Sequence, residues 1–246
     1  MLSKTHLKYI QTLYHKKNRD AQNLFIAEGS KVVMELLHSN NYLCKELIAT
    51  ESWLLANAAI LAKITTTQIL TVESFELEKI SLLSTPNEVM AIFNQEQQAA
   101  FSPKNSITLV LDEIKDPGNL GTIIRIADWF GVQNIVCSTH CVEQYNPKVV
   151  QSTMGSIARV NVFYTDIIAW LNNYPSIKKY AATLSGQDIK QIPTITEGII
   201  LIGNESKGIS PALQVLATDC ITIKKMGGAE SLNAAVATGI ILSHVL

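Results

Sequence analysis

The chain has 246 residues, of which 47% are hydrophobic and 17% are charged, and its formal net charge is -1. This composition is sufficient for a sizeable core in one or two domains, and the near-neutral charge gives no overall attraction to nucleic acid. There is no signal-peptide pattern and no apolar run long enough to cross a bilayer, so we expect a cytoplasmic protein without a membrane partner. The four cysteines, which are irregularly spaced, fit that compartment.

The first nineteen residues carry an excess of basic side chains and contain no Asp or Glu. One interpretation is an amphipathic helix whose apolar residues, such as Leu7, Ile10 and Leu13, face a core while the bases face water. The other is a surface that contacts phosphate, and a single helix can do both. The candidate phosphate contacts are Lys4, Lys8, Lys16, Lys17 and Arg19.

Residues 23–94 alternate between short strand patterns and helix patterns, which indicates a small α/β domain. We expect strands at 24–27, 46–50, 69–72 and 89–93, and helices at 30–38, after 52 and at 74–82. Residues 95–106 follow neither period and are predicted to be a linker. The predicted domains are therefore 1–98 and 106–246.

A second alternation occupies the remainder of the chain and predicts a mostly parallel sheet covered on both faces. The expected strands are 107–111, 134–138, 160–163, 179–183, 199–202 and 220–223. The expected helices are 120–130, 147–156, 167–171, 211–217 and 231–245.

Three stretches place polar side chains where such a sheet builds ligand sites. Residues 119–125 open a helix, Gly203-Asn204-Glu205 ends a strand, and Ser231-Leu232-Asn233 opens the final helix. Because parallel sheets bind ligands outside the carboxyl ends of their strands, we expect the three stretches to converge on one crevice.

Several other kinds of site do not fit the pattern. No G-x-G-x-x-G follows a strand and no G-x-x-x-x-G-K-[ST] is present, so neither a dinucleotide site nor a phosphate loop is expected. The absence of a G-x-S-x-G elbow argues against an acyl-transfer triad. Cys137 and Cys141 lack a second pair of ligands, so no metal site is expected.

Residues 116–125, 201–209 and 221–236 resemble, in this order, the three motifs of the SpoU (TrmH-type) RNA ribose 2'-O-methyltransferases. Residues 23–29 resemble the start of the ribosomal-protein-like substrate-binding domain of members that act on ribosomal RNA. The resemblance implies an α/β fold in which the C-terminal parallel-sheet domain forms a trefoil knot of the SPOUT type, a rare exception to the rule against threading. It also implies S-adenosyl-L-methionine bound in the knot, and a homodimer.

Carried onto this sequence, the methyl-donor site of the family falls on segments that follow predicted strands. Glycines let the backbone approach a ligand closely, and apolar side chains can wall an adenine ring. Taken alone, Ile223, Met226 and Leu232 fit ordinary core positions equally well. The implied donor-binding residues are Thr183, Leu184, Ser185, Gly186, Gly203, Asn204, Ile223, Met226, Ser231 and Leu232.

The resemblance places the catalytic set on Arg125, Asn119, Glu205, Ser231 and Asn233. Because a guanidinium holds its proton, our hypothesis is that Arg125 binds the RNA phosphate beside the target ribose and aligns the hydroxyl. The proton then leaves to that phosphate, to Glu205 or to water. Glu205 needs a partner, and Arg125 is the expected one. Asn119 is alternatively a helix cap, as are Ser231 and Asn233.

The sequence thus predicts S-adenosylmethionine-dependent methyl transfer to a ribose 2'-hydroxyl of RNA, with ribosomal RNA favoured over transfer RNA by the N-terminal resemblance. The alternative is a non-catalytic RNA-binding or ribosome assembly factor of the same fold. The presence of the whole catalytic set named above argues against this alternative. A plain nucleotide-binding enzyme would need a phosphate loop. Lys224 and Lys225 stand where many members have proline, and they face either RNA phosphate or the carboxylate of the donor.

Overall fold

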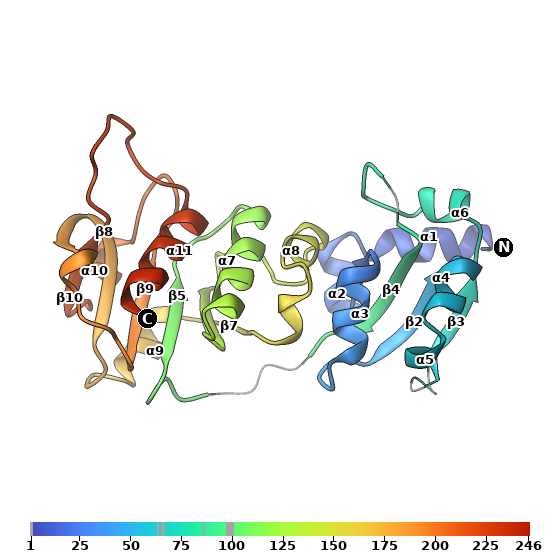
Figure 1. Ribbon diagram of the computed structural model, residues 1–246, viewed down its shortest axis with the longest axis horizontal. Coiled ribbons are helices and arrows are strands. Elements are labelled where there is room, and N and C mark those ends of the chain that lie inside the picture. The colour runs from blue at the N-terminus through green and yellow to red at the C-terminus, as the bar shows by residue number, and fades with distance from the viewer. Residues whose placement is uncertain (1, 63, 65–66, 86, 97–100) are drawn as a thin grey trace. The chain divides into compact units, whose positions relative to one another are not determined.

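The computed structural model describes residues 2–62, 64, 67–85, 87–96 and 101–246, so part of the expected linker lies outside the described residues. The chain forms two compact units, which are described separately (Figure 1). The N-terminal unit comprises Met1–Gln97 and Tyr145–Ala158, and the C-terminal unit comprises Gln98–Gln144 and Arg159–Leu246. Within the described ranges, none of the helices combines the length and the apolar character needed to span a membrane.

The N-terminal unit is built on a four-stranded sheet. Its elements are α1 (Lys4–Thr12), α2 (Lys16–Gln22), β1 (Leu24–Glu28), α3 (Ser30–His38), β2 (Cys44–Ala49), α4 (Glu51–Ala56), α5 (Ala58–Leu61), β3 (Gln68–Thr71), α6 (Ser74–Glu78), β4 (Val89–Asn94), α8 (Pro147–Ser152) and η1 (Ser156–Ala158). The strand order is β1-β4-β2-β3, with β4 antiparallel to both neighbours and β2 parallel to β3.

Both faces of this sheet are covered by apolar side chains. Alternate residues of a strand point to opposite faces. Accordingly, Phe25 of β1 joins one core cluster with Val33 of α3, and Ile26 joins another with Ile10 of α1. The expected inward face of the first helix is therefore present in the structure.

The segment Tyr145–Ala158 completes the core of the N-terminal unit although it lies far along the chain. The Tyr145 ring lies 4.6 Å from the Phe25 ring, and the Tyr42 hydroxyl donates to the Ile157 carbonyl at 3.3 Å. The predicted domain 106–246 includes this segment, but the segment packs with the first unit because its apolar side chains are buried there.

The C-terminal unit contains a six-stranded sheet in which all neighbouring strands among the described residues pair in parallel, and this confirms the predicted parallel sheet. Its elements are β5 (Ile107–Leu111), α7 (Pro117–Trp129), β6 (Asn134–Ser138), β7 (Asn161–Thr165), α9 (Ile167–Asn172), β8 (Lys179–Asp188), η2 (Ile189–Gln191), β9 (Gly198–Ile202), α10 (Pro211–Gln214), β10 (Asp219–Thr222) and α11 (Ala234–Val245). The strand order is β10-β8-β9-β5-β6-β7.

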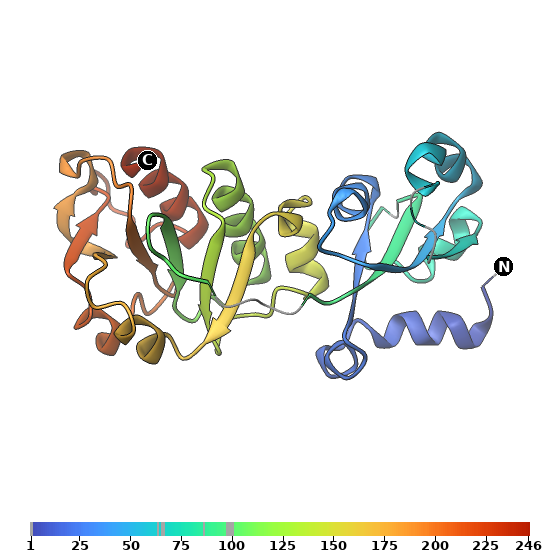
Figure 2. The same cartoon turned by 90° about the horizontal axis from the view of Figure 1, so that it is seen from below.

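Helices lie on both faces of the parallel sheet. Val110 of β5 and Leu201 of β9 pack with Trp170 of α9 and Leu213 of α10. Figure 2 shows α7 and α11 side by side on the opposite face from α9, in agreement with the extensive contact between α7 and α11. The central strands are consequently buried on both sides, as their continuous apolar sequences predict.

The pairing of β8 with β10 is interrupted. Ala181 pairs with Cys220, whereas the next residue of β10, Ile221, pairs with Gln187. Residues 182–186 of β8 therefore form an extra stretch that does not pair with β10. A Cβ on Gly186 would lie 2.5 Å from the Cys220 carbonyl oxygen, so only glycine permits this approach.

Candidate active site

Helix α7 begins at Pro117, two residues before Asn119, which the sequence pattern offers as the cap. The side chain of Asp116 accepts a hydrogen bond from the Asn119 amide at 2.8 Å, and Pro117 occupies the first helical position. The alternative that Asn119 caps the helix is therefore wrong, and its side chain is available for other contacts. The Asp116-Pro117 pair is the sequence signal that identifies this helix start.

The Asn119 side chain joins all three polar stretches. Its Nδ2 donates to Glu205 Oε1, and its Oδ1 accepts a hydrogen bond from Asn233 Nδ2 at 2.7 Å. Asn233 Oδ1 also accepts from the amides of Ala235 and Val236, so this residue caps α11 as well. The cap interpretation of Asn233 is thus correct, and the same side chain also contacts Asn119. The expected convergence of the three stretches occurs around one amide group.

A tight turn at the end of β9 presents Glu205. Asn204 Oδ1 accepts hydrogen bonds from the Ser206 and Lys207 amides, and Asn204 Nδ2 donates to the Glu113 carbonyl at 2.9 Å. A Cβ on Gly203 would lie 2.2 Å from backbone atoms of Gly208 and Ile209. The turn therefore requires glycine at position 203, and it fixes the direction in which Glu205 points.

Arg125 differs from the expectation that it pairs with Glu205. Its side chain is exposed on α7, and within the described residues no hydrogen bond or ion pair of Arg125 is found. Asn119 is the partner of Glu205 instead, because it projects from the first turn of α7 at the end of β9. Arg125 is left exposed toward solvent. Ser231 is likewise exposed, and Asn233 rather than Ser231 caps α11.

The side chains expected to bind the methyl donor are mostly exposed. Leu184 is 79% exposed, Met226 87% and Leu232 46%, whereas Ile223 is half-buried. The alternative that Ile223, Met226 and Leu232 are ordinary core residues is wrong for Met226 and Leu232. Thr183 Oγ1 donates to the Ser185 carbonyl, which folds the extra stretch of β8 back on itself. Lys224 and Lys225 are exposed on the segment after β10.

Cys141, which follows β6, stabilises the loop after β5, and Cys137 lies beside it at the end of β6. Cys141 Sγ donates to the Leu111 carbonyl and accepts from the Ile114 amide, both at 3.3 Å. Hydrogen bonding, first with Cys137, lowers the pKa of Cys141 to about 7, while burial raises the pKa of Cys137. Among the described residues, no group of three potential metal ligands is found around them or elsewhere.

The basic residues of the N-terminal unit fall into two groups. Lys4, Lys8, Lys16 and Lys17 are exposed. Arg19 is 1% exposed and donates from Nη1 to the Leu13 carbonyl at 2.8 Å, so it joins α2 to the end of α1. The expectation that Arg19 contacts phosphate does not fit its position, since the guanidinium is inside the unit.

Comparisons with known proteins agree with this architecture. The profile of the SpoU rRNA methylase family matches residues 106–243. The chain belongs to this family. The profile of the MRM3-like substrate binding domain matches residues 4–91, within the N-terminal unit. The resemblance of the three motifs to the SpoU family is thereby confirmed.

Full-length relatives of this SpoU family member are found in several bacteria. The 23S rRNA (guanosine(2553)-2'-O)-methyltransferase RlmP of Bacillus subtilis is 27% identical, and the match covers 95% of this chain and 92% of RlmP. The AdoMet-bound rRNA methyltransferase from Sinorhizobium meliloti is 29% identical with a TM-score of 0.87, covering 100% and 96% of the two chains. A TrmH-family protein from Porphyromonas gingivalis is 35% identical with a TM-score of 0.86, covering 99% and 98%.

Proposed function

We propose that this chain transfers a methyl group from S-adenosyl-L-methionine to a ribose 2'-hydroxyl of ribosomal RNA. The observation that carries the proposal is the Asn119 side chain, which bonds to Glu205 and Asn233 and so unites the three motif segments of a SpoU family member. The relative RlmP acts on 23S rRNA, and the match to it covers nearly the whole of both chains.

The residues of the C-terminal unit fit the donor. An adenosyl group needs apolar walls, and the exposed Leu184, Met226 and Leu232 supply them. Gly186 and Gly203 let the backbone segments beside these residues pack closely on Cys220 and Gly208. When bound, the donor supplies a sulfonium methyl group that is already an activated electrophile. The structure of the Sinorhizobium meliloti relative contains AdoMet.

The proposed chemistry of the chain itself is mainly positioning. Asn119 donates to one carboxylate oxygen of Glu205 and so holds this side chain beside the start of α7. We assign Arg125 to the phosphate beside the target ribose, because its exposed guanidinium can make two parallel hydrogen bonds to phosphate oxygens. The 2'-hydroxyl is then aligned for attack, and its proton leaves to phosphate, Glu205 or water. Ser231 completes the polar set.

The remaining parts of the proposal concern the whole molecule. A trefoil knot follows from membership of the SpoU family, and it would involve the segment after β10, whose helix α11 packs against α7 and bonds to the Ile195 amide through the Val245 carbonyl. Residues 1–98 serve as the RNA substrate-binding domain, and residues 106–246 serve as the methyltransferase domain except for Tyr145–Ala158, which packs with the first unit. The protein works as a cytoplasmic homodimer with ribosomal rather than transfer RNA as its substrate.

The test combines donor binding with mapping of the product. Titration calorimetry of the full chain is expected to detect binding of both S-adenosylmethionine and S-adenosylhomocysteine. Mapping of ribose methylation by mass spectrometry, in RNA from cells with and without the gene, is expected to identify one ribosomal nucleotide. Binding of neither ligand together with an unchanged methylation map would refute the proposal in favour of a non-catalytic RNA-binding factor.

A further inference from the structure

The loop between β5 and α7 holds Glu113 in an unusual backbone conformation. Its φ is +55°, a left-handed value that residues other than glycine seldom adopt. The Glu113 amide donates to Ser138 Oγ at 3.0 Å, and its carbonyl accepts from Asn204 Nδ2. The main chain of Glu113 is therefore fixed by two neighbouring strand ends, and a residue held in this way directs its side chain to one place.

Two lysines face the Glu113 carboxylate. Lys115 Nζ lies 3.3 Å and Lys207 Nζ 3.7 Å from Glu113 Oε2. Neither contact has hydrogen-bond geometry, since Oε2 accepts no hydrogen bond from the described residues. The two lysine side chains are 60% and 73% exposed. Ion pairs whose ammonium groups remain in solvent contribute little to stability, although the Oε2 atom that the two lysines share is itself buried.

These charges flank the Asn119 network directly. Lys115 immediately precedes Asp116, which caps the helix that carries Asn119. Lys207 lies in the turn that presents Glu205, and the Asn204 side chain ties that turn to Glu113. Lys115, Lys207 and the nearby His140 also lower the pKa of Glu113, so the carboxylate is ionised at neutral pH.

We propose that Glu113 is an internal substitute for an RNA phosphate. In the free protein its carboxylate holds Lys115 and Lys207 beside the site, and in the complex both lysines bind backbone phosphate of single-stranded RNA next to the target nucleotide. This inference rests on the proposed function. RNA is favoured over the donor carboxylate because the two ammonium groups are exposed and project from different loops, as contacts to an extended polyanion require.

Such an exchange has a consequence for selectivity. RNA must displace the Glu113 carboxylate before it gains the two lysines, so RNA that lacks the other contacts of the substrate binds weakly. Removing the Glu113 charge frees the lysines and is expected to tighten binding of any single strand. Removing either lysine has the opposite effect.

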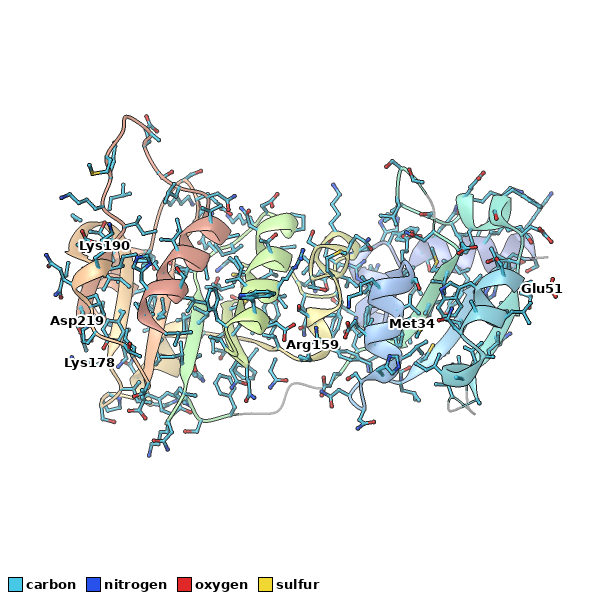
Figure 3. All side chains as sticks on the ribbon, viewed as in Figure 1. Met34, Glu51, Arg159, Lys178, Lys190 and Asp219 are labelled. Carbon is cyan, nitrogen blue, oxygen red and sulfur yellow. The ribbon has the colours of Figure 1, made fainter. Side chains whose placement is uncertain are left out.

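The test measures RNA affinity as a function of salt for the full-length chain. The probe is a fluorescein-labelled single strand of about twenty nucleotides, because each phosphate contact to a single strand contributes about -0.7 to the slope of log K against log salt. The variants are Lys115→Gln, Lys207→Gln and Glu113→Gln. The control is Lys178→Gln, which removes an exposed lysine (labelled in Figure 3) just before β8 begins, whereas Lys115 and Lys207 follow the carboxyl ends of β5 and β9.

We expect each of the two site lysine variants to weaken RNA binding about threefold to tenfold and to reduce the magnitude of the slope by about 0.7. Glu113→Gln is expected to tighten binding and to steepen the slope, and Lys178→Gln is expected to match the unmodified chain. Calorimetry is expected to give the same S-adenosylmethionine affinity for all of them.

Three outcomes overturn the inference. Unchanged RNA affinity and slope in both site lysine variants show that these residues do not meet phosphate. A loss of S-adenosylmethionine binding in Lys207→Gln assigns that lysine to the donor carboxylate. Loss of turnover in Glu113→Gln without a change in RNA binding shows that Glu113 only holds the loop. Absence of methyl transfer by the unmodified chain refutes the proposed function but leaves the salt comparison valid.

Discussion

The buried charged side chains of the N-terminal unit and the polar side chains around the candidate site of the C-terminal unit have different roles. In the N-terminal unit Arg19 and Glu28 are buried, and each bonds to atoms of its own unit. In the C-terminal unit Asn119, Glu205 and Arg125 lie at the carboxyl ends of strands or along α7, half-buried or exposed. The first arrangement holds elements together, and the second leaves functional groups for other molecules.

This difference shows that the type of residue does not reveal its role. Arg19 and Arg125 both fit a phosphate contact by sequence, yet Arg19 bonds to the Leu13 carbonyl whereas Arg125 is exposed. Burial distinguishes the roles of the two arginines, because a buried guanidinium needs hydrogen-bond partners inside the fold whereas an exposed one is accessible to a ligand. Substitutions in the first unit are thus expected to change stability, and those in the second are expected to change activity.

The largest effect on activity is expected from Gly203→Ala. Its Cβ would lie 2.2 Å from the backbone of Gly208 and Ile209, so the turn that carries Glu205 must move. Overpacking of this kind costs about 3 kcal/mol, equivalent to a roughly 100-fold loss of donor affinity in calorimetry. Gly228→Ala is the control, since nothing lies within 4 Å of its added Cβ. Equal donor affinity for Gly203→Ala and the control would contradict the role given to the turn.

Asn119→Ala tests whether the polar network serves turnover. The substitution removes the hydrogen bonds to Glu205 and Asn233, and we expect kcat to fall about 30-fold, which corresponds to about 2 kcal/mol. Donor affinity and melting temperature are expected to change little. Asn161→Ala removes a comparable hydrogen bond to Asn134 away from the site and provides the control. A large drop in melting temperature without a drop in kcat would make the network structural.

Arg125→Lys sharpens the contrast between the two arginines. Lysine keeps the charge but loses the planar fork, so one of two phosphate hydrogen bonds is lost, and we expect kcat/KM to fall about tenfold with unchanged stability. Near-normal turnover would argue against two parallel hydrogen bonds between the Arg125 guanidinium and phosphate.

The matched change in the other unit is Arg19→Met. It is expected to lower the free energy of unfolding by about 1–3 kcal/mol in denaturant titration, because the Leu13 carbonyl loses its buried donor.

The smallest effect is expected from Glu28→Gln and depends on pH. Burial raises the pKa of Glu28, in spite of hydrogen bonds from Ser81 and the Leu82 amide. A carboxyl with a raised folded pKa stabilises the fold fully below its unfolded pKa of about 4.3, and this stabilisation is lost as pH rises through the folded value.

The variant is therefore expected to melt higher than the unmodified chain by about 2 °C or less at pH 7, with the gain vanishing near pH 4. Differential scanning calorimetry from pH 4 to pH 8 provides the measurement, with the exposed Glu78→Gln as the control. A gain that is constant across this range would contradict the pKa direction.

Much of the fold follows from local sequence. The helix expected at 30–38 and the strands expected at 107–111 and 134–138 have those bounds in the structure, because apolar runs and caps mark them. The order of the strands in each sheet, and the antiparallel position of β4, depend on contacts between distant segments, so the alternation of elements alone did not determine them.

The site was predicted to the level of which segments meet, but not which atoms bond. Motif order indicated that Asn119, Glu205 and Asn233 lie together, and they do. The pairing of Glu205 with Asn119 rather than Arg125 depends on where α7 begins, and Asp116 determines that start. The sequence around Glu113 gives no indication of its left-handed backbone, because the hydrogen bonds that hold this conformation come from the distant residues Ser138 and Asn204.

The position of Tyr145–Ala158 constrains how such enzymes can be recombined. The polypeptide leaves the N-terminal unit, returns to it and leaves it again, so a single splice in the linker would separate Phe25 and Tyr42 from the side chains that cover them. A chimera that exchanges recognition modules between relatives must therefore transfer this internal segment along with the first 97 residues. Gly155 makes the requirement strict, because even an added methyl group there would lie 2.5 Å from the side chain of Glu35.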